Sequence, residues 1–311
     1  MSKEVATAPI KPLFDPTGWK TIALEHITWQ APDYRKEAAF YIALMGWKLR
    51  SDDGKQAILD IGDWGSAIFK AAPPEQKTAL VTGIGYAIQP WNAKKVEAEL
   101  RKRNLDPVAD NNGKFESFHV KDPDGFDVQI GNSNGLVKAR KTPATAKIDT
   151  ELPFAPTGWR TVWLDHLSYA ATNYKATVSY FKNLLGWGGV YDEGSLEEVL
   201  MGDIGDALIR GGNPFNPNFG KPPANGRGQG PSNVRINHIS FGIQPFDPDA
   251  VKDALASRKL RAREDTGGTG DIHQAAYKSY HTGTPNGYDL QISFVTKDTR
   301  LVGSENMRPK Q

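Results

Sequence analysis

Six histidines are the residues of this chain best suited to metal or proton chemistry, and their positions follow a pattern. Three lie in segments that alternate apolar and polar residues as strands do, in the contexts LEHITW, LDHLSY and INHISF. Two more precede the turn-forming sequences DPDG and TPNG, and the sixth follows a glycine-rich stretch. A neutral imidazole is the commonest metal ligand in proteins, and its pKa suits acid or base catalysis near neutral pH. The three sets are His26, His166 and His238; His119 and His281; and His273.

Strand alternation predicts which of these side chains share a face, because every second residue of a strand points to the same side. In INHISFGI the apolar positions alternate with polar ones, so His238 and Ser240 share the face opposite to the apolar residues. The same test places His166 with Ser168, and it places Gln291 on the polar face of YDLQIS. The apolar faces are expected to pack against helices.

The elements that position these residues occur twice, because the chain repeats itself. Residues 14–70 contain FDPTGWKTIALEHITWQAPDY, LMGWKL and GDWGSAIFK, and residues 154–210 contain FAPTGWRTVWLDHLSYAATNY, LLGWGG and GDIGDALIR. A repeat this dense indicates a duplicated domain. Within each half the pattern of one strand, one helix and three short strands occurs two times. We therefore predict an α+β protein with tandem duplicated domains, each made of two βαβββ modules that form a mixed sheet with helices outside.

The repeat also predicts the domain boundaries. The two domains are expected at residues 14–132 and 154–296, with a linker at 133–153 that has little apolar content and several turn formers. A C-terminal tail follows at 297–311. Residues 211–233 are rich in Gly, Pro and Asn and have no counterpart in the first half, which indicates either a lid over a site or a surface insertion.

Composition limits the class of partner. The chain has 311 residues, 39% of them hydrophobic and 24% charged, and a net charge of only +2, so neither nucleic acid nor a membrane is an expected partner. A small-molecule substrate is expected, and a homodimer is left open. No apolar stretch approaches the length of a membrane span, which favours the cytoplasm, although a removed export signal is not excluded. The absence of cysteine rules out disulfides and thiolate chemistry.

The sequence resembles the vicinal oxygen chelate superfamily, which includes glyoxalases, bleomycin-resistance proteins and extradiol dioxygenases. The resemblance is carried by the three strand histidine contexts, by the helix ends LMGW and LLGW, and by the last-strand segments KDPDGFDVQI and GTPNGYDLQI. It extends from about residue 14 to residue 296, and four modules in one chain are most similar to the extradiol ring-cleaving dioxygenases. The resemblance implies that the sheet of each domain curls into a cup lined by its polar face.

The resemblance also implies a metal site in the second cup, formed by His166, His238 and Gln291. Fe2+ is the metal that the family implies, with Mn2+ or Zn2+ as alternatives. In the dioxygenases the third position is a Glu, which completes a facial triad of two His and one carboxylate. The neutral amide of Gln291 offers an oxygen but no charge, so it is expected to hold a divalent ion less tightly. A cup that binds an organic ligand without metal therefore stays an alternative.

Further site residues follow from the same resemblance. His281 falls where ring-cleaving relatives have a Tyr that contacts the substrate, and it is an acid–base candidate together with His273. Tyr280 alternates to the other face, so at most one of this adjacent pair is expected to face the cup. The expected substrate contacts are Ser168, Ser240, Arg210 and Tyr280.

The first half provides an internal comparison. Its positions matching the three ligands are His26, Gly83 and Gln129, so only one imidazole remains and this domain is predicted to be structural. The nearby carboxylates of Glu25 and Asp127 are expected to point to the opposite side or to an undetermined one. Because the two halves share the Gln, the amide could instead serve the fold by hydrogen-bonding a neighbouring strand.

These observations predict a metal-dependent enzyme, similar to extradiol dioxygenases, that acts on a small aromatic or enolisable substrate. A lyase or isomerase of the glyoxalase type is the first alternative. A metal-free protein that binds a small molecule, as bleomycin-resistance relatives do, is the second.

Overall fold

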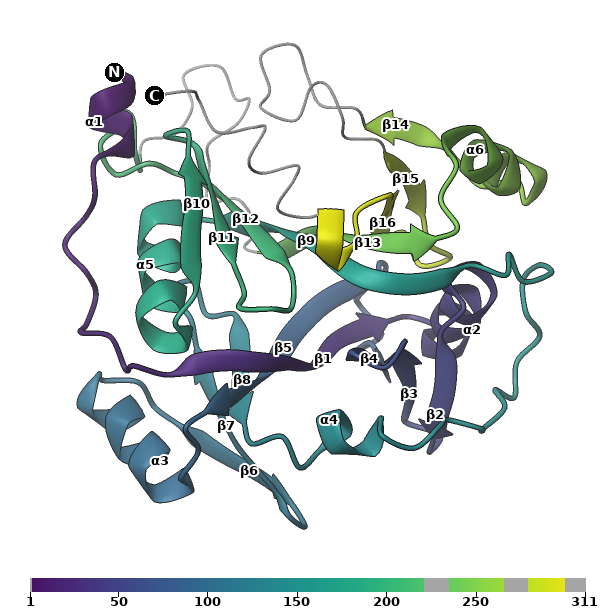
Figure 1. Cartoon of the computed structure of the whole chain (residues 1–311), viewed down its shortest axis with the longest axis horizontal. Coiled ribbons are helices and arrows are strands. Elements are labelled where there is room, and N and C mark those ends of the chain that lie inside the picture. The colour runs from purple at the N-terminus through teal and green to yellow at the C-terminus, as the bar shows by residue number, and fades with distance from the viewer. Residues whose placement is uncertain (1, 221–234, 266–278, 300–311) are drawn as a thin grey trace. The chain divides into compact units, whose positions relative to one another are not determined.

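The computed structural model of the chain describes residues 2–220, 235–265 and 279–299. Within these residues the strands form two eight-stranded sheets, ordered β2-β3-β4-β1-β5-β8-β7-β6 and β10-β11-β12-β9-β13-β16-β15-β14 (Figure 1). The first sheet is built from the first half of the sequence and the second sheet from the second half. Both are mixed, because β5 pairs with β8 and β13 with β16 in parallel, next to antiparallel pairs. The predicted α+β fold of repeated βαβββ modules is confirmed.

Apart from the short helices α1 and α4, the two halves contain the same succession of elements. The first half has α1 (Lys3–Thr7), β1 (Lys20–Ala31), α2 (Tyr34–Met45), β2 (Lys48–Asp52), β3 (Gln56–Ile61), β4 (Gly65–Ala71), β5 (Leu80–Gln89), α3 (Ala93–Lys102), β6 (Val108–Asn112), β7 (Phe115–Lys121), β8 (Asp127–Gly131) and α4 (Leu136–Ala139). The second half has β9 (Arg160–Ala171), α5 (Tyr174–Leu185), β10 (Gly188–Asp192), β11 (Leu196–Leu200), β12 (Asp206–Gly211), β13 (Arg235–Gln244), α6 (Pro248–Ser257), β14 (Arg263–Asp265), β15 (Ser279–Gly283) and β16 (Asp289–Ser293). None of the described helices is long and apolar enough to cross a membrane.

Local sequence sets the ends of the first helix in each half. Asp33 caps the start of α2 and Asn173 the start of α5, each accepting a hydrogen bond from a backbone N–H three residues on. Both helices end at a glycine in the left-handed conformation, Gly46 with φ of 71° and Gly186 with φ of 69°. Left-handed glycine is the usual way to end a helix, because a side chain there is strained.

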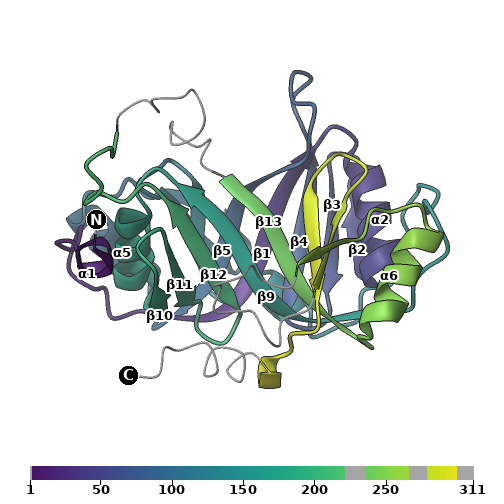
Figure 2. The same cartoon turned by 90° about the horizontal axis from the view of Figure 1, so that it is seen from above.

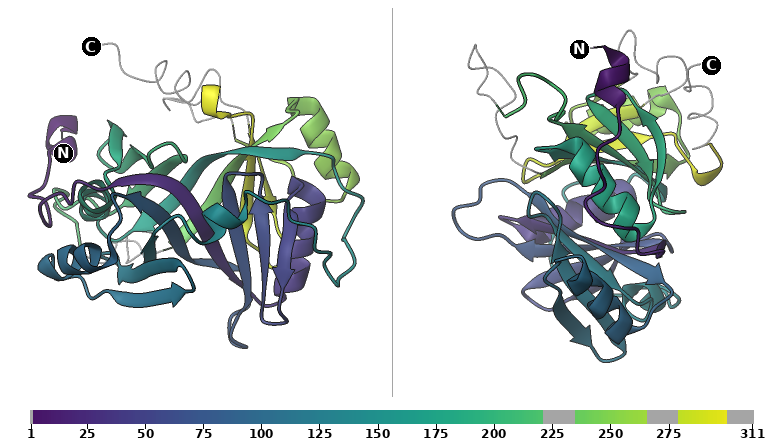
Figure 3. Two further views of the ribbon diagram at one scale, coloured as in Figure 1. Left: turned by 60° about the horizontal axis from the view of Figure 1, so that its bottom comes forward. Right: turned by 90° about the vertical axis from the view of Figure 1, so that its left-hand side faces the viewer.

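Each of these helices covers the sheet strands that follow it in the chain. Helix α2 packs on β3 and β4, and α5 packs on β11 and β12 (Figure 2). The shorter α3 contacts β7 and α6 contacts β15, as Figure 3 shows for α3 in blue. Beneath α2, Trp29 stacks on Phe69 with ring centroids 5.1 Å apart, and Tyr41 stacks on Trp47 at 4.4 Å. All four rings are buried, so the apolar sheet face predicted from alternation is the core.

Contacts between residues divide the chain into two compact units, and each unit combines segments of both sequence repeats. Unit 1 holds Met1–Ile27, Val81–Ala139 and Leu167–Asn237, and unit 2 holds Thr28–Leu80, Arg140–His166 and His238–Gln311. The compact units therefore divide the chain differently from the sequence repeats.

Unit 2 shows how the two repeats are joined. The PTGW segment of the second repeat lies on the end of α2 from the first, where Thr157 donates its hydroxyl hydrogen to the carbonyl of Leu44 at 2.7 Å. Thr161 donates to the carbonyl of Met45 at 2.9 Å and accepts from the indole N–H of Trp47 at 2.9 Å. The last carbonyls of a helix have no partner within the helix, so these hydroxyls satisfy groups that would otherwise be unpaired.

Unit 1 contains the reciprocal arrangement. Thr17 of the first repeat donates to the carbonyl of Leu184 at 2.8 Å, and Thr21 donates to that of Leu185 at 3.0 Å, both at the end of α5. The indole N–H of Trp187 donates to Thr21 at 3.1 Å. The repeated motif PTGW therefore binds the helix end of the opposite repeat, which explains why each unit needs both halves of the sequence.

Candidate metal centre

Two of the predicted ligands meet in unit 2. His166 on β9 and His238 on β13 point their Nε2 atoms at one another, 3.2 Å apart. Nitrogen ligands lie about 2.0–2.1 Å from a bound zinc ion, so two nitrogens at this separation are close enough to share one ion. His166 is 8% exposed, and His238 is half-buried. The two imidazoles are thus brought together in a partly buried environment.

A buried carboxylate lies behind this pair. Asp165 has its Oδ2 atom 3.4 Å from Nδ1 of His166, and it accepts a hydrogen bond of 2.7 Å from the hydroxyl of Ser240. A carboxylate beside Nδ1 favours a proton on that nitrogen, which leaves the lone pair of Nε2 for a metal. Sequence reasoning missed Asp165, although an acidic residue precedes the strand histidine in both repeats. Ser240, predicted as a substrate contact, is fully buried and bonded to this carboxylate.

A second group of candidate ligands lies on the neighbouring strands β16 and β15. Asp289 is the parallel strand neighbour of His238, and His281 is the antiparallel neighbour of Gln291. Nδ1 of His281 lies 3.1 and 3.0 Å from the two carboxylate oxygens of Asp289. One ligand atom each from His238, His281 and Asp289 lie within 4.8 Å of one another, close enough to hold a metal ion. Asp289 was not predicted, although it lies two residues before Gln291 and so on the same strand face.

Gln291 is fully buried and engaged in the sheet. Its amide nitrogen donates to the hydroxyl of Ser279 at 2.7 Å and lies 3.4 Å from a carboxylate oxygen of Asp265. In the first half, Gln129 makes the matching contacts with Ser117 at 2.8 Å and with an Asp110 oxygen at 3.3 Å. The amide therefore connects three adjacent strands in both halves. This agrees with the alternative that the Gln serves the fold by hydrogen-bonding neighbouring strands.

His119 and His281 also have matching surroundings. Asp127 lies 2.7 Å from Nδ1 of His119, and Asp110 lies 3.3 Å from its Nε2. The hydrogen bond with Asp127 is the main cause of the raised pKa of His119. The expectation that Asp127 points to the opposite or an undetermined side is thus corrected: it shares the face of Gln129, two residues away, because strand side chains alternate with a period of two.

His281 has a carboxylate at each ring nitrogen as well. Its Nε2 lies 3.2 Å from Asp265, in addition to the Nδ1 contact with Asp289. Burial on its own would lower the pKa of His281, but hydrogen bonds with Asp265 and Asp289 outweigh it and raise the pKa. The imidazole therefore holds a proton more firmly than a free histidine does.

The raised pKa of His119 predicts a pH-dependent contribution to stability. A folded-state pKa above the unfolded value of about 6.5 stabilises the fold below that pH, and the benefit is lost as pH rises through the folded pKa. We expect the stability advantage of the wild type over His119→Gln to be largest in mild acid and to shrink as pH rises beyond neutrality. Urea denaturation of both proteins across this range measures it, and an advantage that does not change with pH would contradict the assignment.

The first half lacks the second imidazole, and its remaining histidine is packed differently. His26 has Nδ1 3.2 Å from Glu25, whose other oxygen accepts the N–H of Leu136. A Cβ on Gly85, the counterpart of Ser240, would lie 2.8 Å from the ring of His26. The ring thus lies over Gly85, and position 83, a glycine, offers no ligand.

Other predicted residues lie elsewhere. Tyr280 is buried on β15, which α6 contacts, and strand alternation turns it to the side opposite to its neighbour His281. Ser168 is buried on β9, and Arg210 is exposed at the end of β12. His273 and residues 221–233 of the predicted lid lie outside the described residues.

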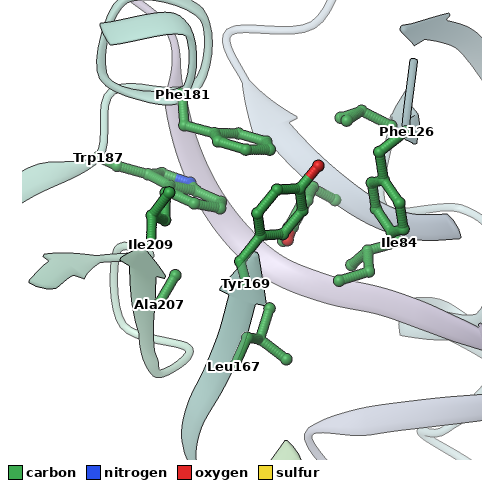
Figure 4. A pocket seen from close by; sticks show the side chains of 10 residues that line it. Ile84, Phe126, Leu167, Tyr169, Phe181, Trp187, Ala207 and Ile209 are labelled. Atoms are coloured by element: carbon green, nitrogen blue, oxygen red, sulfur yellow. The ribbon is translucent and has the colours of Figure 1, made fainter. Parts of the chain in front are cut away.

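Unit 1 contains a separate apolar pocket, shown in Figure 4. Phe181 and Trp187 stack in its wall with ring centroids 4.4 Å apart, and the ring of Tyr169 lies between them and Phe126. The hydroxyl of Tyr169 donates to Asp122, so it is satisfied within the unit. The lining of the pocket contains no His or acidic side chain, so we interpret the pocket as part of the core. Its lining residues are Ile84, Tyr86, Phe126, Val128, Leu167, Tyr169, Phe181, Trp187, Ala207 and Ile209.

No model of a known protein family and no curated protein sequence matches the chain. Among solved structures, the 2,3-dioxygenase LapB from Pseudomonas sp. KL28 is similar with a TM-score of 0.63 and 14% identity, over 88% of this chain and 92% of that one. An extradiol ring-cleaving dioxygenase from B. fuscum has a TM-score of 0.62 and 16% identity, over 95% and 75% of the two chains.

A glyoxalase is similar as well. The Mn(II)-bound glyoxalase from Novosphingobium aromaticivorans has a TM-score of 0.61 and 14% identity, over 91% of this chain and 86% of that one. At such identities the likeness concerns the fold. The chain therefore has the fold shared by extradiol dioxygenases and glyoxalases, as the sequence resemblance to the vicinal oxygen chelate superfamily predicted.

Proposed function

We propose that this protein is a metal-dependent enzyme of the vicinal oxygen chelate superfamily, which acts on a small substrate with two adjacent oxygen atoms. The observation that carries the proposal is the approach of His166 and His238, whose Nε2 atoms lie 3.2 Å apart. Asp165 at Nδ1 of His166 supports it, because a carboxylate in that position orients metal-ligating histidines.

In this proposal His166 and His238 hold the ion and Asp165 fixes the orientation of the first imidazole. A bound divalent ion supplies Lewis acidity toward the substrate oxygens. His281, whose ring centroid lies 4.9 Å from that of His238, is the acid–base candidate within the described part of the chain.

Ring cleavage of an aromatic diol is the reaction we favour, since dioxygenases of this kind share the fold over most of this chain. Glyoxalase-type lyase or isomerase chemistry is the second candidate. It is favoured by the neutral Gln291 at the position of the dioxygenase Glu, and by the likeness to the Mn(II)-bound glyoxalase.

Metal content and turnover test the proposal together. The purified full-length chain is loaded anaerobically with Fe2+, Mn2+ or Zn2+, desalted and measured for bound metal. Each form is then assayed for oxygen uptake with a panel of catechols, and for conversion of the adduct of methylglyoxal and glutathione. We expect about one ion per chain and turnover in one of the two assays. If the protein retains no ion from any of the three solutions, the proposal of a metal-dependent enzyme is wrong.

A further inference from the structure

We infer that the carboxylate of this metal site is supplied by Asp289, and that Gln291 is not a ligand. The inference rests on the proposed function, since it adds to the pair of His166 and His238. In this inference Asp289 supplies the carboxylate that a Glu supplies in the dioxygenases. Asp289 lies two residues before Gln291, the position that corresponds to that Glu.

The arrangement of strands places these groups together. Strands β13, β16 and β15 are consecutive neighbours in the sheet, and His238 lies directly beside Asp289 on the adjacent strand. His281 on the third strand contacts both oxygens of Asp289. Ligand atoms of these three residues lie within 4.8 Å of one another. His166, His238 and Asp289 make a set of two imidazoles and one carboxylate, which suits iron and related divalent ions.

Charge favours Asp289 over Gln291. A carboxylate attracts a divalent ion, whereas an amide oxygen offers only a dipole. The amide nitrogen of Gln291 is already directed at Ser279 and Asp265, and Gln129 shows the same contacts in the half that has no second imidazole. These nitrogen contacts hold the side chain of Gln291 in the sheet without a metal ion.

The first half offers a matched control for each residue. His119, Asp127 and Gln129 reproduce the contacts of His281, Asp289 and Gln291. The difference is position 83, where glycine replaces the imidazole of His238. A substitution in the first half thus removes the same local hydrogen bonds without removing a proposed ligand.

Metal affinity separates the roles of Asp289 and Gln291. Binding of Mn2+ and Co2+ to the full-length chain is measured by competition with a fluorescent chelator for the wild type, Asp289→Asn, Asp127→Asn, Gln291→Leu and Gln129→Leu. We expect Asp289→Asn to lower the affinity by about 100-fold or more, a larger loss than a group behind the ligands causes. The metal affinity of the other three variants should stay within about 3-fold of the wild-type value, which is less than a tenfold change. The visible absorption of bound Co2+ should change only in Asp289→Asn.

The possible results are distinguishable. The inference would be wrong if Asp289→Asn binds metal with wild-type affinity, or if Gln291→Leu loses metal binding. Neither result would contradict the proposed function. A wild type that binds neither ion would overturn both. Thermal melting of each variant checks folding, and Asp289→Glu, which keeps the charge, should retain more affinity than Asp289→Asn if that variant proves unstable.

Discussion

Replacing His238 with alanine is expected to lower the affinity for a divalent ion by more than about 100-fold and to abolish turnover, because it removes a proposed ligand of the ion. Its Nε2 lies 3.2 Å from that of His166, and it belongs to the cluster with His281 and Asp289. Isothermal titration with Mn2+ measures the loss, and circular dichroism should show an unchanged fold, since His238 is only half-buried.

His26→Ala is the matched control for this experiment. His26 occupies the corresponding strand position in the first repeat, where it lies over Gly85 and beside Glu25. We expect its loss to lower stability modestly and to leave metal affinity and turnover near wild-type values. An equal loss of metal binding in both variants would contradict the placement of the site in the second half.

Gly46→Ala is expected to lower the free energy of unfolding by about 2–5 kcal/mol. Gly46 has a φ of +71°, which is strained for any residue with a Cβ, and that Cβ would lie 2.1 Å from the carbonyl oxygen of Trp159. The methyl group would therefore push the PTGW segment off the end of α2, where Thr157 and Thr161 pair with the helix carbonyls. Chemical denaturation followed by tryptophan fluorescence measures the change.

Gly54→Ala separates backbone strain from collision. Gly54 has a φ of +85°, but a Cβ there would have no atom within 4 Å, so only the left-handed strain applies, about 1–2 kcal/mol. We expect the cost at Gly46 to exceed the cost at Gly54 clearly. Equal costs would show that the junction between the repeats yields easily and contributes little to stability.

Local sequence patterns predict strand faces and helix ends well in this chain. Alternation in INHISFGI correctly indicated an apolar side for Ile239 and Phe241, both fully buried, with His238 on the other side. Helix ends were readable because a capping Asp or Asn and a final Gly act within a few residues. These signals are local, so they can be interpreted without knowing which strands pair with one another.

Sequence reasoning failed where a partner lies far along the chain. Asp165 forms its hydrogen bond with Ser240, which lies 75 residues away, so no local pattern could pair them. The face on which the Asp127 side chain lies was predicted wrongly, although strand alternation places it on the same face as Gln129. The division into compact units was also hidden, because the carbonyls that Thr157 satisfies belong to the other repeat.

The sequence by itself determined the order of the elements, the duplicated α+β fold and the face on which the strand histidines lie, because these depend on periodicity and on residues close in the chain. The tertiary structure decided which polar groups touch. The strand pairing of β13 with β16 and of β16 with β15 sets His238 beside Asp289 and His281 beside Gln291. Such contacts depend on the register between strands from distant segments, and shifting that register by one residue would turn every one of these side chains to the other face.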